Sequence, residues 1–134
     1  MAEEATLVIV KPDAVRRGLI GEILGRFERK GLRIEAMRRM TIDRDLAEHH
    51  YDEHRDKAFF GELVDFITSG EVVVARVMGE QAVSVVRTLM GPTDPAAAPP
   101  GTIRGDYGVV ITENLVHGSD SPESAKRELD LFFG

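Results

Sequence analysis

The chain has 134 residues, 43% of them hydrophobic and 30% charged, which predicts one globular domain over residues 1–134. Its formal net charge of -6 argues against a general nucleic-acid or anionic-membrane binder, but it allows a local basic pocket for a phosphorylated small molecule. There are no cysteines, which excludes disulfides and cysteine-ligated zinc.

The predicted elements begin with a short strand. Met1 to Glu4 is acidic, and the apolar run after it is too short for a signal peptide or a membrane span, so we expect a cytoplasmic protein. Thr6 to Val10 is rich in β-branched residues and runs into Lys11–Pro12, which predicts a buried strand followed by a turn. Apolar residues at helical spacing over 20–27, followed by Gly31, predict an amphipathic helix with a glycine stop.

The middle of the chain alternates between strand and helix patterns. Residues 32–39 alternate with period two, which predicts a strand with one solvent-exposed face. Residues 43–69 follow a helical pattern in two pieces, 72–77 is apolar and predicts a third strand, and 82–89 carries another helical stripe. The apolar run 109–111 is the candidate for the fourth strand.

A final helix completes the order of elements. Ser121 and Pro122 are a good N-cap and first-turn pair, and apolar residues up to Phe133 would pack this helix on the core. The order is strand, helix, strand, helices, strand, helix, strand, helix. It fits best an α+β fold, a ferredoxin-like βαββαβ sandwich with a four-stranded antiparallel sheet and added helices. A parallel doubly wound sheet is the alternative.

The stretch 91–108 is a long Pro/Gly-rich loop in this prediction. It holds four of the six prolines and four of the thirteen glycines. Loops of this length in compact domains are usually either functional or disordered. Thr93, Thr102 and Arg104 are donor types that suit a phosphate, which favours a functional loop.

The segment Asn114–Asp120 sets His117 in a small polar turn. An imidazole has an ordinary pKa of about 6.5, so much of it is neutral near neutral pH and a ring nitrogen can attack an electrophile. Taken alone, His117 also fits a structural turn histidine. His50 and His54 stand four residues apart and could share a metal, but the sequence indicates no third ligand.

A nucleotide would have to be held by side chains. The chain lacks a P-loop, and Gly18, Gly21 and Gly25 have the wrong spacing for a dinucleotide fingerprint. Lys11 and Arg87 are candidate phosphate ligands, although each alone is typical of a solvated surface charge.

Taken together, several motifs resemble nucleoside diphosphate kinases. They are residues 10–13 (VKPD), 99–106 (PPGTIRGD), 114–120 (NLVHGSD), the stretch 50–60 and the turn 68–70. The resemblance extends from about Thr6 to Phe133, and it implies a single domain of this family. The second and third motifs are highly specific as a pair.

The resemblance implies a ping-pong phosphotransferase. His117 would be the nucleophile and would carry the γ-phosphate of a nucleoside triphosphate, mainly ATP, to a nucleoside diphosphate as phosphohistidine. Glu128 matches the glutamate that orients this histidine, and Ser119 is expected beside the histidine and the transferred group. A ferredoxin-like nucleotide-binding or sensing module that has lost catalysis is the alternative.

The same resemblance assigns the nucleotide site. The phosphate clamp would comprise Lys11, Tyr51, Arg87, Thr93 and Arg104. Asn114 and Lys11 would hold the ribose hydroxyls. Phe59 would stack on the base, which predicts broad base specificity because stacking is tolerant of base identity, and broad sugar specificity if the 2′-OH is not essential. Periodicity alone does not decide whether Phe59 or Phe60 faces outward.

The implied cofactor is Mg²⁺. It would be held by the nucleotide phosphates rather than by a protein cage, with Asp120 touching its waters or acting as a cap. The implied partners are nucleoside triphosphates and diphosphates, and copies of the chain in a hexamer or tetramer, with no nucleic acid and no membrane.

Overall fold

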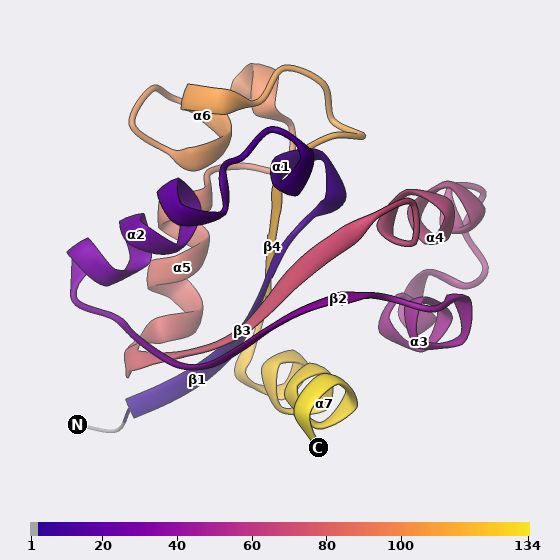
Figure 1. Ribbon diagram of the computed structural model, residues 1–134, viewed down its shortest axis with the longest axis horizontal. Coiled ribbons are helices and arrows are strands. Elements are labelled where there is room, and N and C mark those ends of the chain that lie inside the picture. Colours follow the sequence, from indigo (N-terminus) through magenta and orange to yellow (C-terminus); the bar gives the residue numbers. More distant parts are fainter. Residues whose placement is uncertain (1–2) are drawn as a thin grey trace.

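A four-stranded antiparallel sheet forms the centre of the protein, which a computed structural model describes for residues 3–134. The strands lie in the order β2-β3-β1-β4 (Figure 1). They are β1 (Glu3–Val10), β2 (Arg33–Thr41), β3 (Glu71–Glu80) and β4 (Val116–Gly118). The α-helices are α1 (Pro12–Arg16), α2 (Ile20–Lys30), α3 (Arg44–His50), α4 (Phe60–Ile67), α5 (Ala82–Met90), α6 (Ile103–Tyr107) and α7 (Pro122–Phe133). This order confirms the ferredoxin-like α+β prediction and excludes a parallel sheet.

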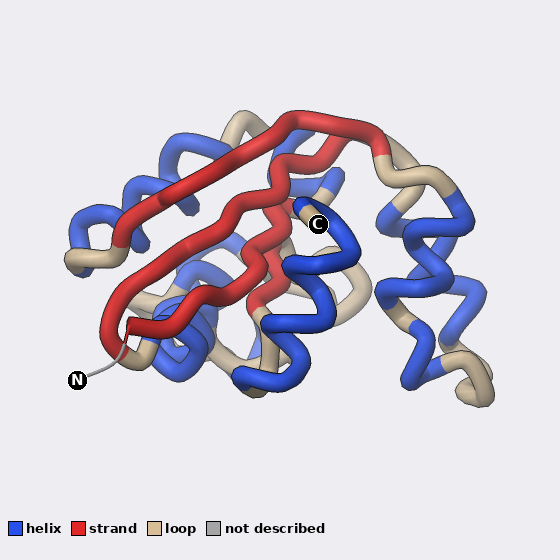
Figure 2. Tube along the Cα trace, turned by 90° about the horizontal axis from the view of Figure 1, so that it is seen from below, coloured by secondary structure: helices blue, strands red, loops and turns tan. Residues whose placement is uncertain are grey.

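The central strands β1 and β3 are buried on both faces of the sheet, because two hydrophobic clusters use their alternate residues. Val8 and Val10 of β1 pack toward α2 and α5, whereas Leu7 and Ile9 pack toward α3, α4 and α7. Figure 1 shows α2 and α5 on one side of the sheet and α7 on the other, and Figure 2 shows α7 lying across its face. The period of two in a strand thus gives β1 one set of contacts on each face.

The predicted helix boundaries follow from local chemistry. Gly31 ends α2 with φ 109°, a left-handed conformation that favours glycine. At the start of α7 the Ser121 hydroxyl accepts a hydrogen bond from the Ser124 amide at 3.0 Å, and Pro122 occupies the first turn. Both boundaries agree with the sequence-based prediction.

The predicted fourth strand at 109–111 is wrong. Those residues form a turn in which Val109, Val110 and Ile111 are 75%, 48% and 53% exposed. The fourth strand is β4, and it pairs with β1 by setting His117 opposite Ile9. His117 therefore lies in a strand and not in a turn. Pairing with the buried residues Val8 to Val10 of β1 decides the strand, whereas apolar content alone favoured 109–111.

Two further local predictions need correction. Residues 91–108 are not free of regular structure, since they contain the short 3₁₀ helix η2 (Pro95–Ala97) and α6. Another such helix, η1 (Asp52–His54), lies between α3 and α4. The turn expected at Lys11–Pro12 is the start of α1, with Pro12 in its first turn where its missing N–H is harmless.

Candidate active site

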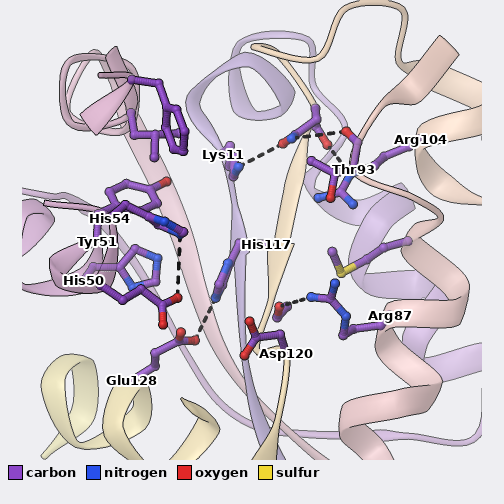
Figure 3. A pocket seen from close by; sticks show the side chains of 16 residues that line it. Lys11, His50, Tyr51, His54, Arg87, Thr93, Arg104, His117, Asp120 and Glu128 are labelled. Carbon is purple, nitrogen blue, oxygen red and sulfur yellow. Dashed lines mark hydrogen bonds and ion pairs between the residues drawn. The ribbon is translucent and has the colours of Figure 1, made fainter. Parts of the chain in front are cut away.

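A cavity of about 360 Å³ opens beside β4 and α3 (Figure 3). Ten of the residues singled out from the sequence line it: Lys11, Tyr51, Phe59, Arg87, Thr93, Arg104, Asn114, His117, Asp120 and Glu128. They come from separate segments of the chain that the sheet and its helices bring together. The remaining predicted residue, Ser119, is fully buried and does not line the cavity.

His117 is placed by the register of β4. It stands opposite Ile9, so its side chain shares the face of the sheet that α3 and α7 cover. Its Nε2 lies 2.7 Å from Oε1 of Glu128, which α7 presents from that side (Figure 3). Within residues 3–134 no group hydrogen-bonds to Nδ1, so this nitrogen is free for a reactant in the cavity.

Glu128 is a buried carboxylate with two hydrogen-bond donors. It is 5% exposed, and its Oε1 accepts from His117 and from the Ser119 hydroxyl, each at 2.7 Å. The Ser119 oxygen in turn accepts the Leu7 amide at 3.2 Å, which ties the pair to β1. Burial alone would raise the pKa of Glu128, but the hydrogen bond from His117 and the neighbouring imidazoles outweigh it and lower that pKa. Ser119 thus lies behind the carboxylate and holds it in place.

His50 is the main site residue that the sequence did not assign. It ends α3, is 4% exposed, and its ring meets that of His117 edge-on at a centroid distance of 4.7 Å. Burial, and then the charge of His117, lower the pKa of His50 well below its usual value, so the ring is neutral. The sequence offered two signals for His50, its position before Tyr51 and its spacing from His54, but neither indicates a contact with His117. His54 also lines the cavity, and the sequence assigned it no role in binding nucleotide or in catalysis.

The opposite wall of the cavity carries Lys11. Its ammonium donates to Oδ1 of Asn114 at 2.8 Å. Burial, followed by repulsion from Arg104, lowers the pKa of Lys11 to about 8, and Asp13 partly opposes that change. A carboxylate oxygen of Asp13 also accepts a hydrogen bond from the Leu115 amide at 3.2 Å. This bond holds Leu115, the residue after Asn114, at its unusual φ of 76°.

Arg104 ties the loop after α5 to the entry of β4. Its guanidinium donates to three backbone carbonyls, those of Gly91 at 3.0 Å, Asn114 at 3.0 Å and Val116 at 2.7 Å. Burial, and then the charge of Arg87, lower the pKa of Arg104 to about 10. It is therefore a cation at neutral pH that both shapes the cavity and adds positive charge to it.

Arg87 reaches the cavity because α5 lies close to β4. Its guanidinium donates to the Gly118 carbonyl at 3.2 Å. A Cβ at Gly118 would stand 2.7 Å from Sδ of Met90 and 2.8 Å from Cγ1 of Val86, so only glycine allows this approach. The absence of a side chain at 118 thus brings a second arginine beside His117.

An apolar recess adjoins the charged cavity and shares Lys11, Thr93 and Asn114 with it. Phe59 and Ile111 line the recess, and Phe59 is 44% exposed. Phe60 packs instead against the hydrophobic core. Periodicity left the orientation of this pair open, and the structure presents Phe59 as the outward ring.

Comparisons with known proteins show similarity over nearly the whole chain. A family model described as nucleoside diphosphate kinase matches residues 4–134. A nucleoside diphosphate kinase of Rubrobacter xylanophilus is 64% identical over 131 residues, covering 98% of this chain and 98% of that protein. One from Archaeoglobus fulgidus is 61% identical over 97% of this chain and 86% of that protein. The solved structure of a halophilic nucleoside diphosphate kinase from Halobacterium salinarum in complex with CDP has a TM-score of 0.96 and 52% identity, covering 98% of this chain and 88% of that one.

Proposed function

The chain belongs to the nucleoside diphosphate kinase family and is a phosphotransferase; from that premise we propose that His117 carries the phosphoryl group between two nucleotides. A nucleoside triphosphate, mainly ATP, donates its γ-phosphate to His117, and a nucleoside diphosphate then takes that group from the same cavity. The family comparisons do not favour a module that has lost catalysis.

One observation carries this assignment, the 2.7 Å contact between Nε2 of His117 and Glu128. Because the carboxylate accepts a hydrogen bond from the Nε2–H group, it favours the tautomer in which Nε2 carries the proton and Nδ1 holds the lone pair. Nδ1 attacks the γ-phosphorus, the bond from that phosphorus to the bridging oxygen breaks, and the nucleoside diphosphate leaves with the bonding electrons. The ring gains positive charge in this step, and Glu128 stabilises it.

The surrounding cations are proposed to bind the phosphates. Phosphoryl transfer needs charge stabilisation and alignment of attacking and leaving atoms, and little else from the protein. Lys11, Arg87 and Arg104 supply positive charge at the cavity wall, and Tyr51 and Thr93 supply hydroxyl groups that line it. The amide of Asn114, already bonded to Lys11, is placed for a ribose hydroxyl.

The recess beside the cavity is proposed to hold the base. Phe59 offers an exposed ring face, and stacking on it is tolerant of base identity. Broad specificity for purines and pyrimidines follows, because no polar side chain is assigned to a base edge. Acceptance of both ribose and deoxyribose requires in addition that the 2′-OH is not essential for binding.

The donor set also fits Mg²⁺ that arrives with the nucleotide. Asp120 is an exposed carboxylate at the cavity wall, whereas Glu128 is engaged with His117 and Ser119. A hard, strongly hydrated cation suits one carboxylate acting through water together with phosphate oxygens. When bound, Mg²⁺ would neutralise charge on the phosphates, and Asp120 would orient its waters.

Two wider properties belong to the same proposal. The exposed apolar run 109–111 supports an assembly of several copies, a hexamer or tetramer, because large exposed apolar patches mark interfaces. The net charge of -6 supports the absence of nucleic-acid partners. None of the helices in residues 3–134 has the length and apolar character that crossing a bilayer requires. We propose a cytoplasmic location and one domain over residues 1–134.

The test is phosphoenzyme formation. With γ-labelled ATP the protein should give an acid-labile, alkali-stable phosphoenzyme that passes its label to GDP, CDP and UDP. The His117→Ala variant should give none. If a folded His117→Ala protein still becomes labelled, the nucleophile is another residue; if the wild type is never labelled, the catalytically silent alternative gains support.

A further inference from the structure

Three side chains at one end of the cavity form a candidate metal-ligand set, and one of them, His50, has no role in the phosphoryl transfer proposed above. His50 from α3, His117 from β4 and Glu128 from α7 each offer one nitrogen or oxygen atom, and these atoms lie within 4.8 Å of one another. Figure 3 shows the three side chains converging from their separate elements. The pairing of His50 with His54 that the sequence allowed is not part of this set.

A second observation concerns the His50 side chain itself. His50 is 4% exposed, and its Nδ1 is buried with no hydrogen-bond partner in residues 3–134. Buried polar atoms in native proteins are nearly always satisfied, and exceptions often mark an ion or water site. The charge on the His117–Glu128 pair does not explain why a second imidazole is held beside it without a partner.

We propose that these three residues bind a transition-metal dication of the Zn²⁺ class in the nucleotide-free enzyme and that the bound metal inhibits phosphoryl transfer. Two imidazole nitrogens, one carboxylate and one open position are a donor set typical of zinc sites. Bond lengths of about 2.0–2.2 Å in a tetrahedral site place ligand atoms about 3.3 Å apart. The present separations, from 2.7 Å between His117 and Glu128 to at most 4.8 Å, bracket that value.

The proton balance explains the inhibition. Binding replaces the proton that Nε2 of His117 shares with Glu128, so one proton is released to solvent for each metal bound. The metal then draws electron density from the ring, and Glu128 no longer stabilises charge on it. The inhibition rests on the proposed role of His117, whereas the binding itself does not.

The same chemistry separates this site from the magnesium that accompanies nucleotides. Mg²⁺ prefers an octahedral shell of oxygen ligands and keeps its water, so two imidazoles suit it poorly. Asp120 offers it oxygen at the cavity wall. We therefore expect Mg²⁺ in millimolar excess to leave the three-residue site to Zn²⁺.

The direct test uses the four histidines of the chain as reporters. In ¹⁵N-histidine-labelled wild-type protein without nucleotide, imidazole ¹H–¹⁵N spectra should change for His50 and His117 at one equivalent of Zn²⁺, with excess Mg²⁺ present. His49 and His54 should keep their resonances. Unchanged spectra for His50 and His117, or changes confined to His49 and His54, would overturn the proposal.

Matched variants test the ligand assignment and the inhibition separately. His50→Gln should raise the Kd for Zn²⁺ at least tenfold and raise the Zn²⁺ concentration that halves phosphoenzyme formation in parallel. His54→Gln removes another histidine of the same cavity and should leave the Kd within twofold. Equal Zn²⁺ affinity in both variants contradicts the site. If His50→Gln does not fold, the wild-type spectra still show whether Zn²⁺ binds at His50 and His117. If His117 proves not to be the nucleophile, the same spectra still show whether the metal binds, independently of the proposed function.

Discussion

Replacing Glu128 by glutamine removes the negative charge that faces His117 while keeping the size of the side chain. In the structure this carboxylate accepts two short hydrogen bonds, from Nε2 of His117 and from Ser119, each at 2.7 Å. The glutamine oxygen can still accept both, so the variant isolates the charge. A hydrogen bond to a charged group contributes about 1.5–3 kcal/mol and one to a neutral group about 0.5–1.5 kcal/mol, so losing the charge while keeping the bond costs about 1–1.5 kcal/mol. Since each 1.36 kcal/mol is tenfold in rate, phosphoenzyme formation should slow about 5- to 13-fold.

Rapid-quench measurement of a single turnover with γ-labelled ATP gives this rate directly. The dissociation constant for the nucleotide should change much less, because Glu128 acts through His117 and not on the phosphates. Glu123→Gln removes an exposed charge in the first turn of the same helix and is the matched control. A Glu128→Gln protein that folds normally and is phosphorylated within twofold of the wild-type rate would refute the orienting function of Glu128.

Three other outcomes follow from the geometry. Burial and a neighbouring guanidinium lower the pKa of Lys11 to about 8, and only the protonated amine attracts phosphate. The value of kcat/KM should therefore decrease as the pH rises above about 8, with a slope that approaches a tenfold loss per pH unit. A Lys11→Arg variant stays charged and should lose this limb of the pH profile; a limb that persists unchanged shows that another group titrates. Phe59→Ala should raise KM for purine and pyrimidine nucleotides alike, by about 5- to 160-fold for a stacking contribution of 1–3 kcal/mol, whereas a loss confined to purines would reveal hydrogen-bonded base recognition. Gly118→Ala sets a Cβ 2.7 and 2.8 Å from two side-chain atoms of α5, so calorimetry should show about 1–3 kcal/mol of destabilisation and phosphoenzyme formation should slow. Gly21→Ala, which meets nothing within 4 Å in a helix, should be neutral or stabilising, and equal effects of the two substitutions would contradict this packing argument.

Much of the fold was predictable because its signals are local. The continuous burial of β1 and β3 and the helical stripes of α2, α5 and α7 are all visible as spacing of apolar residues. β4 was not, because its three residues include a histidine and a glycine and its partner is distant in the sequence. The exposed apolar run 109–111 was predicted as a strand because its composition is apolar, but composition does not show which segments pair in the sheet.

The candidate site was predictable to the extent that motifs name its residues. The motifs around Lys11, Arg104 and His117 identified these residues, but the sequence did not show which of their side chains are in contact. The contact of Glu128 with His117 exists because α7 packs across β1 and His117 stands opposite Ile9 in β4. His50 enters through the end of α3, an arrangement set by tertiary packing alone.

Identification of the phosphorylated nitrogen shows whether His117 is the nucleophile and which of its ring nitrogens attacks. The contact between Nε2 of His117 and Glu128 leaves Nδ1 as the attacking atom. NMR spectra of the intact phosphoenzyme, recorded with ³¹P and ¹⁵N-histidine detection, distinguish the two isomers of phosphohistidine. We expect a single phosphohistidine at position 117 with the phosphoryl group on Nδ1. Phosphate on Nε2, or on a different residue, would contradict it.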